Sequence, residues 1–444
     1  MQIITIYDFI LLPVYLGIFY YFVKKKAAFF TDFNMKKIFF IAFVLRMFGS
    51  VTYSLLVQYY YGYGDSFTYY KGSDFIHDQL VQNLGNIKYF FVSSAEFQQW
   101  YNTEVGDMNF SGYTGITSAN AIMKISALLS FISFNKFMII SLFFGLFSFA
   151  GQWKLFQVFN DYNKGKNQTM LAYAVLYSPS IWFWGSGLMK DSVCLGAMGF
   201  IVHILYKNII KKQISFREWL ILPFLIYLVS IIKSYIIIIL AVSIMVVVFV
   251  RYVLQLKNLL VRLIVILLFL IFSGFVIAFA DFSTQINDLV EESYSQVKSN
   301  QQNYQNIQNE DETSKAGFEL GNFDPSLSSM IIKSPGVILS CLFRPFLWES
   351  KKIIILFTAL ESTLLLLVTL YLLLKTRVVG FFRIIFSNQL ILFCFIISIL
   401  FALIIGFTTF NFGTMTRYKI ILLPFYYFML VAIFSKLMEK NRSE

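Results

Sequence analysis

Apolar runs separated by polar turns repeat along the whole chain at a spacing that predicts membrane-crossing helices. A helix needs about 20 apolar residues to cross the hydrocarbon core of a bilayer, and about eleven runs here approach that length. We therefore expect an all-α, polytopic transmembrane helix bundle that forms a single integral membrane domain over residues 1–444. The expected segments are 3–23, 38–59, 137–159, 170–184, 192–206, one on each side of Lys233, 263–280, 353–374, 390–410 and 420–434.

The composition agrees with a membrane protein. The chain is 58% hydrophobic and 14% charged, whereas a soluble domain carries about 25% charged residues. A net charge of +12 would suggest nucleic acid as the partner of a soluble protein. Here the basic residues occupy turns between alternate apolar runs, which is the pattern that sets membrane topology, so nucleic-acid binding is excluded. Three scattered cysteines and two distant histidines provide neither a disulfide framework nor a zinc site.

The basic turns predict an orientation. Lys24, Lys25 and Lys26 directly follow the first apolar run, so this turn is expected in the cytoplasm and the N-terminus outside. Every later turn assigned to the cytoplasm is also basic, and the C-terminus is expected inside. The first run lacks the basic start of a cleavable signal peptide and is expected to remain as an anchor. The isoleucine-, phenylalanine- and lysine-rich composition indicates an AT-rich bacterial genome, and hence the bacterial inner membrane.

Two long polar regions are expected on the outer side. Residues 60–135 have mixed amphipathic character and predict helices that lie along the membrane interface. Residues 281–351 begin acidic, and residues 300–312 are rich in asparagine and glutamine. Such low-complexity polar sequence predicts a solvated, partly mobile loop.

The stretch from Ser178 to Ser192 is the strongest functional candidate. It lies between two apolar runs, contains Pro179, and reaches Lys190 and Asp191 at the membrane face. Ionisable residues at that depth are costly and are functional candidates by default. Irregular backbone is tolerated there only when it is buried in protein or lines a wet cavity. In the alternative interpretation, Lys190 and Asp191 pair with each other, or Asp191 caps a helix beside a lysine that extends to the interface.

Asp65 is the second candidate, because it follows an apolar run in Gly62-Tyr-Gly-Asp-Ser. A carboxylate at a low-dielectric boundary has a raised pKa, which suits a general base. Alternatively, Asp65 starts an interfacial helix as its cap. Further charged residues expected on the outer side are either substrate ligands or interface anchors beside an aromatic belt; these are Lys233, Arg344, Glu349, Arg417 and Lys419.

The expected topology indicates the class of substrate. The cytoplasmic turns are short and basic and contain no glycine-rich phosphate cradle, which argues against a nucleotide-driven reaction inside. On its outer face a membrane protein meets lipid-linked substrates. These need cations for a phosphate, a carboxylate to deprotonate an acceptor, and an apolar groove for the tail.

Asp65 after a membrane helix, the Pro-Ser-x-x-x-Trp-Gly-Ser-Gly-x-x-Lys-Asp turn that starts at Pro179, and the final Arg417-Tyr-Lys419 before an apolar helix together resemble the GT-C superfamily of membrane glycosyltransferases. The resemblance is to its mannosyltransferase-like members, which use polyprenyl-phosphate sugars. It implies that Asp65 is the catalytic base and that basic residues such as Lys190, Arg344 and Arg417 hold the phosphate. Asp191, Arg344 and Glu349 would orient the sugar or the cations, with Lys233 and Lys419 as further ligands.

The resemblance also implies the partners: a polyprenyl-phosphate sugar donor, a glycolipid, glycan or protein acceptor, and membrane lipid. Many members have two adjacent acids in the first loop, whereas this chain has Gly64-Asp65-Ser66, which argues against a divalent metal cofactor. The chain also departs from the family by an extra leading helix and by the lack of a soluble C-terminal domain.

Two alternatives remain open. An O-antigen or exopolysaccharide polymerase or ligase also has ten to twelve helices and outer arginines. A flippase or transporter for lipid-linked saccharides would show ionisable residues through the depth of its helices and an inverted repeat. Arg46 is the main charge within an apolar run, which predicts that it faces protein rather than lipid, and the chain shows no repeat.

Overall fold

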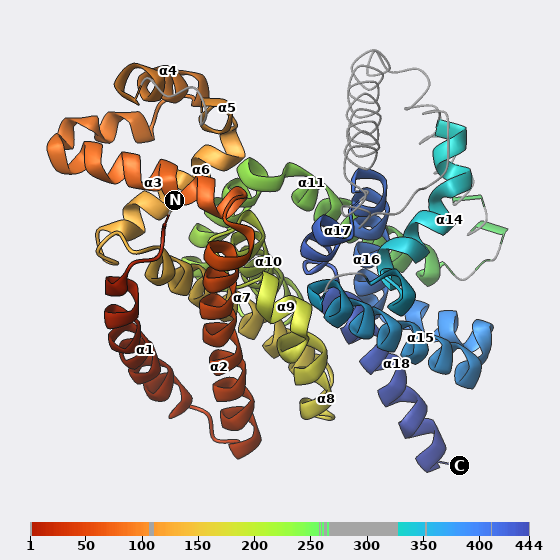
Figure 1. Ribbon diagram of the computed structural model, residues 1–444. Coiled ribbons are helices and arrows are strands. Elements are labelled where there is room, and N and C mark those ends of the chain that lie inside the picture. Colours follow the sequence, from red (N-terminus) through yellow and green to blue (C-terminus); the bar gives the residue numbers. More distant parts are fainter. Residues whose placement is uncertain are drawn as a thin grey trace. The chain divides into compact units, whose positions relative to one another are not determined.

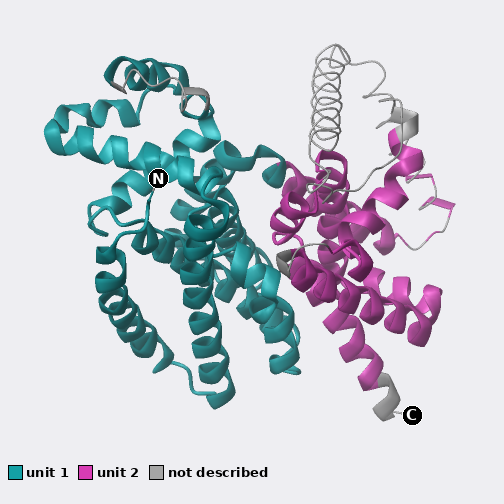
Figure 2. Cartoon of the chain, in the orientation of Figure 1, with its two compact units in different colours: residues 1–237 teal, residues 238–444 magenta. Residues whose placement is uncertain are grey.

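The computed structural model describes residues 2–105, 111–256, 327–350, 353–409 and 411–443, together with positions 258, 260–261 and 264–265. The expected segment 263–280, apart from positions 264 and 265, and the asparagine- and glutamine-rich residues 300–312 lie outside the described residues. The described chain is helical (Figure 1). The elements assigned to the described residues include no β-strand. It divides into two compact units, Met1–Ile237 and Ile238–Glu444 (Figure 2).

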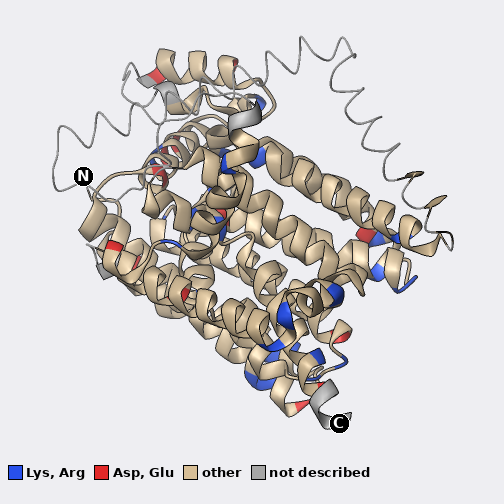
Figure 3. Ribbon diagram, turned by 90° about the vertical axis from the view of Figure 1, so that its right-hand side faces the viewer, with Lys and Arg blue, Asp and Glu red and all other residues tan. Residues whose placement is uncertain are grey.

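Several of the described helices are long and apolar enough to cross a membrane. There are 7 of them, or 8 if a bent pair near the C-terminus is one span. Charged residues occupy few positions along the helical ribbons, most of which are neutral (Figure 3). This confirms the all-helical class and is compatible with a multi-pass membrane protein, whereas the count of about eleven crossings stays a prediction.

The long helices of unit 1 are separated in sequence by a group of shorter ones. The chain from Asp65 to Ser130, which was expected to form interfacial helices, folds into α3, α4, α5 and α6, and α3 packs along α6 (Figure 1). The bounds are α1 Ile6–Ala27, α2 Phe33–Leu56, η1 Val57–Tyr61, α3 Asp65–Gln82, η2 Leu84–Phe90, α4 Ser94–Val105, α5 Ser111–Thr114, α6 Thr117–Ser130, α7 Phe137–Tyr162, α10 Lys190–Leu205 and η4 Tyr206–Ile210.

Helices α7 and α10 form the most extensive contact of unit 1, and glycines make it close. A Cβ atom on Gly151 would lie 1.9 Å from the carbonyl oxygen of Gly196, and one on Gly199 would lie 2.0 Å from the carbonyl oxygen of Gly151. The two backbones therefore touch. Small residues allow this approach between membrane helices, where association depends on van der Waals packing rather than on the hydrophobic effect.

The expected segment 170–184 is not one helix. It consists of α8 (Gln168–Ala172), a π-helical turn η3 (Tyr173–Tyr177) and α9 (Pro179–Trp184). The interruption is at Ser178, whose ψ angle of 125° is non-helical. Proline has no backbone N–H and disfavours helical geometry in the residue before it, so the sequence Ser178-Pro179 ends the first helix.

The two segments expected on either side of Lys233 are the two helical arms of α11 (Phe216–Gln255), which meet at a kink where the backbone of Lys233 is non-helical (φ −150°, ψ 83°). The first arm runs antiparallel to α10, because Glu218 bonds Lys207 at 2.7 Å near the end of α10 and Lys233 bonds Asp191 at 2.5 Å near its start.

The two ends of the unit 1 helices differ in charge. Lys24, Lys25 and Lys26 end α1, and the neighbouring helix ends are joined to this side by the Asn34–Gln168 hydrogen bond of 2.7 Å. We call this side the basic end. The opposite side contains the start of α3 and the start of α10, and we call it the Asp65 end. Lysines gathered at one set of helix ends are compatible with the positive-inside pattern of a multi-pass membrane protein.

Unit 2 is a second helical group. Helix α14 packs along α16, and both α15 and α16 pack against α18. Helices α17 and α18 meet at an angle of 62°, just before Pro424. Part of the region 281–351, expected as an outer loop, is thus an apolar packed helix. The bounds are α14 Leu327–Phe343, η6 Leu347–Glu349, α15 Ile353–Phe386, α16 Gln389–Thr408, α17 Phe412–Lys419 and α18 Leu423–Ser443.

We expect Gly151→Ala to destabilise the protein by about 1–3 kcal/mol, because the new methyl group would overlap the backbone of α10. Gly17→Ala is the matched control: it is also within a helix, but nothing lies within 4 Å of its Cβ position, so alanine there should be neutral or stabilising. Thermal unfolding in detergent measures both. Equal melting temperatures for the two variants would contradict the close α7–α10 contact.

Candidate functional site

The turn between α9 and α10 is held by Arg46, which projects from α2. Its Nη1 atom donates to the carbonyl oxygens of Gly185 (2.9 Å) and Ile181 (3.1 Å) and to Ser148 Oγ (3.1 Å). Arg46 is only 2% exposed, which confirms that it faces protein. A cation in such a place must be surrounded by acceptors, because an unsatisfied charge in a low-dielectric interior is costly. Arg46 therefore positions the turn before Lys190.

Asp65 is the first residue of α3. The N-cap position is Gly64, whose φ of 109° favours glycine, and no side chain caps this helix. The helix does begin here, but the expectation that Asp65 itself is the cap is wrong. A carboxylate in the first turn is favoured by the helix dipole. Asp65 is partly exposed, so the carboxylate can reach a ligand.

The start of α3 is attached to the turn before α10. Ser66 Oγ donates to the carbonyl oxygen of Leu188 at 2.8 Å and lies 2.7 Å from the hydroxyl of Tyr53. Ser66 is buried. Asp65 is therefore adjacent to a residue that contacts the chain two positions before Lys190, and the structure brings the Asp65 and Lys190 segments together.

Lys190 starts α10 and is held by two other helices. Its Nζ atom donates to Ser118 Oγ of α6 at 2.8 Å and lies 5.6 Å from the ring centroid of Tyr69 on α3. Contact with an aromatic face stabilises an ammonium group that has lost part of its water. The side chain is half-buried, so Lys190 is oriented but not sealed from a ligand.

Asp191 and Lys233 form a buried ion pair. Asp191 Oδ1 lies 2.5 Å from Lys233 Nζ, and the side chains are 1% and 8% exposed. The interpretation in which Asp191 and Lys190 simply pair with each other is therefore incomplete, since Asp191 pairs with the residue at the break in α11. Because the Asp191 side chain is buried, it does not face a substrate. We assign to Asp191 and Lys233 the role of positioning the start of α10, where Lys190 lies.

The other predicted residues lie in unit 2, where three of them meet. Arg344 Nε donates to Glu349 Oε1 at 2.9 Å, and Arg344 Nη2 contacts the same oxygen. Lys419, only 2% exposed, donates to the carbonyl oxygen of Arg344 at 2.9 Å and to Ser362 Oγ at 3.0 Å. Arg344 and Glu349 thus form an ion pair and are not only members of an aromatic belt.

Arg417 lies on the same short helix as Lys419. Its guanidinium is 5.2 Å from the ring centroid of Tyr418, and it is partly exposed. The guanidinium of Arg344 lies 5.5 Å from the ring of Phe412, at the start of that helix. Helix α17 and the 344–349 turn therefore place both arginines and Lys419 within one region of unit 2.

The residues that hold the site were not singled out from the sequence. Ser66, Tyr69, Ser118 and Ser362 each contact a predicted residue or its backbone, but small hydroxyls and a tyrosine give no local signal. Helix α3 also has two acidic residues that are not among these contacts. Asn135 Nδ2 donates to Asp74 Oδ1 at 2.5 Å. The pKa of the mostly exposed Asp78 is raised by its slight desolvation and by the nearby Asp74 carboxylate.

Neither a metal site nor similarity to a known protein indicates which reaction these residues carry out. Among the described residues, no three His, Cys, Asp or Glu side chains lie close enough to hold a metal ion. Comparisons of the chain with protein-family models, with curated proteins and with solved structures find no match. The side chains themselves offer a carboxylate that can accept a proton and an ammonium that can bind an anion, both at the Asp65 end of unit 1.

We expect Lys233→Met to destabilise the protein by about 3–5 kcal/mol, because it leaves the Asp191 carboxylate buried without its cation. The double variant Asp191→Asn/Lys233→Met removes both charges and should recover much of that loss. Thermal unfolding in detergent provides the measurement.

The control for this prediction is Lys211→Gln. Lys211 pairs with Asp161 at 2.6 Å, but the side chains are 40% and 48% exposed, so its loss should cost less than about 1 kcal/mol. Similar losses for Lys233→Met and Lys211→Gln would contradict this prediction. No recovery in the double variant would show that the loss does not come from the uncompensated charge of Asp191.

Proposed function

We propose that this chain is a GT-C-like membrane glycosyltransferase that moves a sugar from a polyprenyl-phosphate donor to a glycolipid, glycan or protein acceptor. One observation supports it most: the partly exposed carboxylate of Asp65 and the half-buried ammonium of Lys190 belong to segments joined by the Ser66–Leu188 hydrogen bond. A carboxylate base beside a phosphate-binding cation is the minimum that transfer from a lipid phosphate requires.

In the proposed reaction Asp65 accepts the proton of an acceptor hydroxyl. The acceptor oxygen forms a bond to the anomeric carbon of the donor sugar, and the bond between that carbon and the phosphate oxygen breaks. Polyprenyl phosphate leaves with the electron pair, and Lys190 stabilises the negative charge that develops on it. The buried Asp191–Lys233 pair positions Lys190 at the start of α10.

For unit 2, taken by itself, we propose that Arg417 and Arg344 are ligands of a phosphate or a sugar. Glu349 bonds the guanidinium of Arg344 and so limits its orientation. Lys419 is buried against the Arg344 carbonyl, which gives it a positioning role. A guanidinium that remains partly exposed can bind two phosphate oxygens at once, a geometry that an ammonium cannot match.

We propose that the Asp65 end of unit 1 faces outward in a bacterial inner membrane, with about eleven crossings in all, the N-terminus outside and the C-terminus in the cytoplasm. The Lys24–Lys26 turn and the other lysine-rich turns of the basic end support this orientation. It leaves the candidate residues where lipid-linked sugars are handled, away from cytosolic nucleotides.

We expect Asp65→Asn to lower sugar transfer by about 10²–10⁴-fold, the range typical for loss of a general base. Asp78→Asn is the matched control, because Asp78 is an exposed carboxylate on the same helix and should keep near wild-type turnover. The assay follows a radiolabelled polyprenyl-phosphate sugar in membranes that contain the full chain.

Unchanged turnover for Asp65→Asn would remove this mechanism. The product separates the remaining alternatives: a single added sugar supports a glycosyltransferase, whereas joined repeat units seen as a ladder would identify a polymerase or ligase. Movement of intact donor across the membrane without bond cleavage would identify a flippase.

A further inference from the structure

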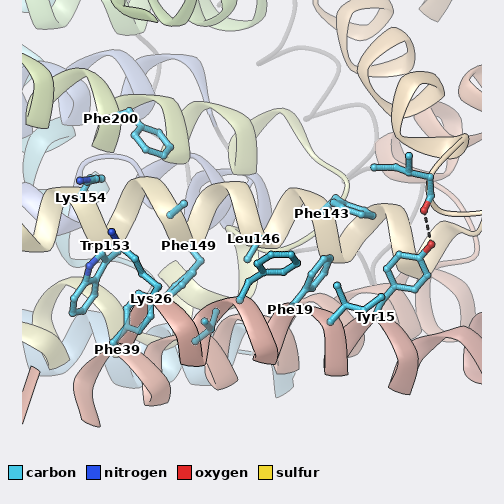
Figure 4. Close-up of a pocket in the computed structure, with 15 residues that line it drawn as sticks. Tyr15, Phe19, Lys26, Phe39, Phe143, Leu146, Phe149, Trp153, Lys154 and Phe200 are labelled. Atoms are coloured by element: carbon cyan, nitrogen blue, oxygen red, sulfur yellow. Dashed lines mark hydrogen bonds between the residues drawn. The ribbon is translucent and has the colours of Figure 1, made fainter. Parts of the chain in front are cut away.

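An apolar groove of about 570 Å³ extends along the surface of unit 1 between α1 and α7 (Figure 4). Phe19, Phe143 and Leu146 line its middle, and α2 and α10 contribute Phe39 and Phe200. All its lining residues belong to unit 1, and Lys190, Ser66 and Asp65 are not among them. The groove is therefore separate from the candidate site.

The groove is apolar along its length and cationic at one end. Lys26 and Lys154 line it at the basic end beside Trp153, whereas Tyr15 closes the other end by a hydrogen bond to the carbonyl oxygen of Ile132 (Figure 4). Its lining contains no acidic residue. Lys154 Nζ lies 3.4 Å from His203 Nε2. Among the described residues neither lysine forms an ion pair at contact distance, although the Glu218 carboxylate, which is paired with Lys207, interacts with Lys154 at longer range.

The dimensions of the groove match one leaflet of a bilayer. About 16 Å of helix separates Tyr15 from Lys26 at 1.5 Å per residue, and half the hydrocarbon core is about 15 Å. An acyl chain of one leaflet spans this distance, whereas a polyprenyl chain of many isoprene units is much longer. Two cations at the headgroup level, with no acidic residue in the lining, favour an anionic headgroup.

We propose that this groove binds an acyl chain of an anionic glycerophospholipid from the leaflet at the basic end, with the lipid phosphate at Lys26 and Lys154. The aromatic lining supplies dispersion contacts to the chain, and the lysines select the charge of the head. Binding here links α1 to α7 through the lipid. The inference does not rest on the proposed enzymatic function.

The test is native mass spectrometry of the full chain in neutral detergent, titrated with dioleoyl phosphatidylglycerol or dioleoyl phosphatidylcholine. We expect phosphatidylglycerol to bind at least about 10-fold more tightly. Lys26→Gln/Lys154→Gln should lose about 10- to 30-fold of that affinity, since each lysine near an anionic head contributes a few-fold to tenfold. Ala150→Trp, which places a bulky side chain in the groove, should weaken binding of the same lipid.

The control is Lys24→Gln/Lys25→Gln, which removes the same charge from the same helix end outside the groove lining and should change affinity by less than about twofold. Equal binding of the two lipids by the wild-type chain, or equal losses in the two double variants, would overturn the proposal. Displacement of phosphatidylglycerol by polyprenyl phosphate at equal or lower concentration would also overturn it. Melting temperatures without added lipid show whether each variant is folded. If Ala150→Trp is not folded, the comparison of the two double lysine variants decides the test.

Discussion

The buried ion pair between Asp191 and Lys233 is the contact on which the arrangement of unit 1 most depends. Both charges are almost completely removed from water, so each requires the other for its desolvation to be offset. The pair joins the start of α10 to the break in α11, and it leaves Lys190, one residue before Asp191, directed toward α3 and α6. Because the buried charges of Asp191 and Lys233 must stay paired, they fix the position of the neighbouring Lys190, which can bind a ligand.

The same requirement organises the other buried cations. Arg46 is surrounded by carbonyl and hydroxyl oxygens from α7 and α9, and Lys419 is held by the Arg344 carbonyl and Ser362. In each case a buried cation connects segments that are distant in sequence. Polar groups of this kind cannot be left unpaired at low dielectric, so they determine which helices meet, whereas the many leucines and phenylalanines around them would tolerate several arrangements.

Close backbone packing complements these polar contacts. Gly151, Gly196 and Gly199 bring α7 and α10 into backbone contact, and Gly185 leaves room for the Arg46 guanidinium, which would lie 2.4 Å from a Cβ atom there. Helices without side chains at their contact can approach more closely and keep their relative position. The turn between α9 and α10 is thus fixed by the glycine contacts of α10 with α7 and by the hydrogen bonds of Arg46. Both limit the movement of the segment that precedes Lys190.

The apolar runs, the basic turns and the breaks at Pro179 and Lys233 could all be recognised from the sequence, because hydrophobic length, charge placement and proline geometry act locally along the chain. Asp65, Lys190 and Arg344 could be chosen for a similar reason: a charge beside an apolar run is conspicuous. Folding was needed to show that Lys233 is the partner of Asp191, that Glu349 binds Arg344, that Ser66 joins α3 to the turn, and that residues 327–343 form a packed helix. These contacts depend on which distant segments come together. In a low-dielectric interior that is determined by individual charge pairs and glycine contacts, which produce no periodic pattern in the sequence.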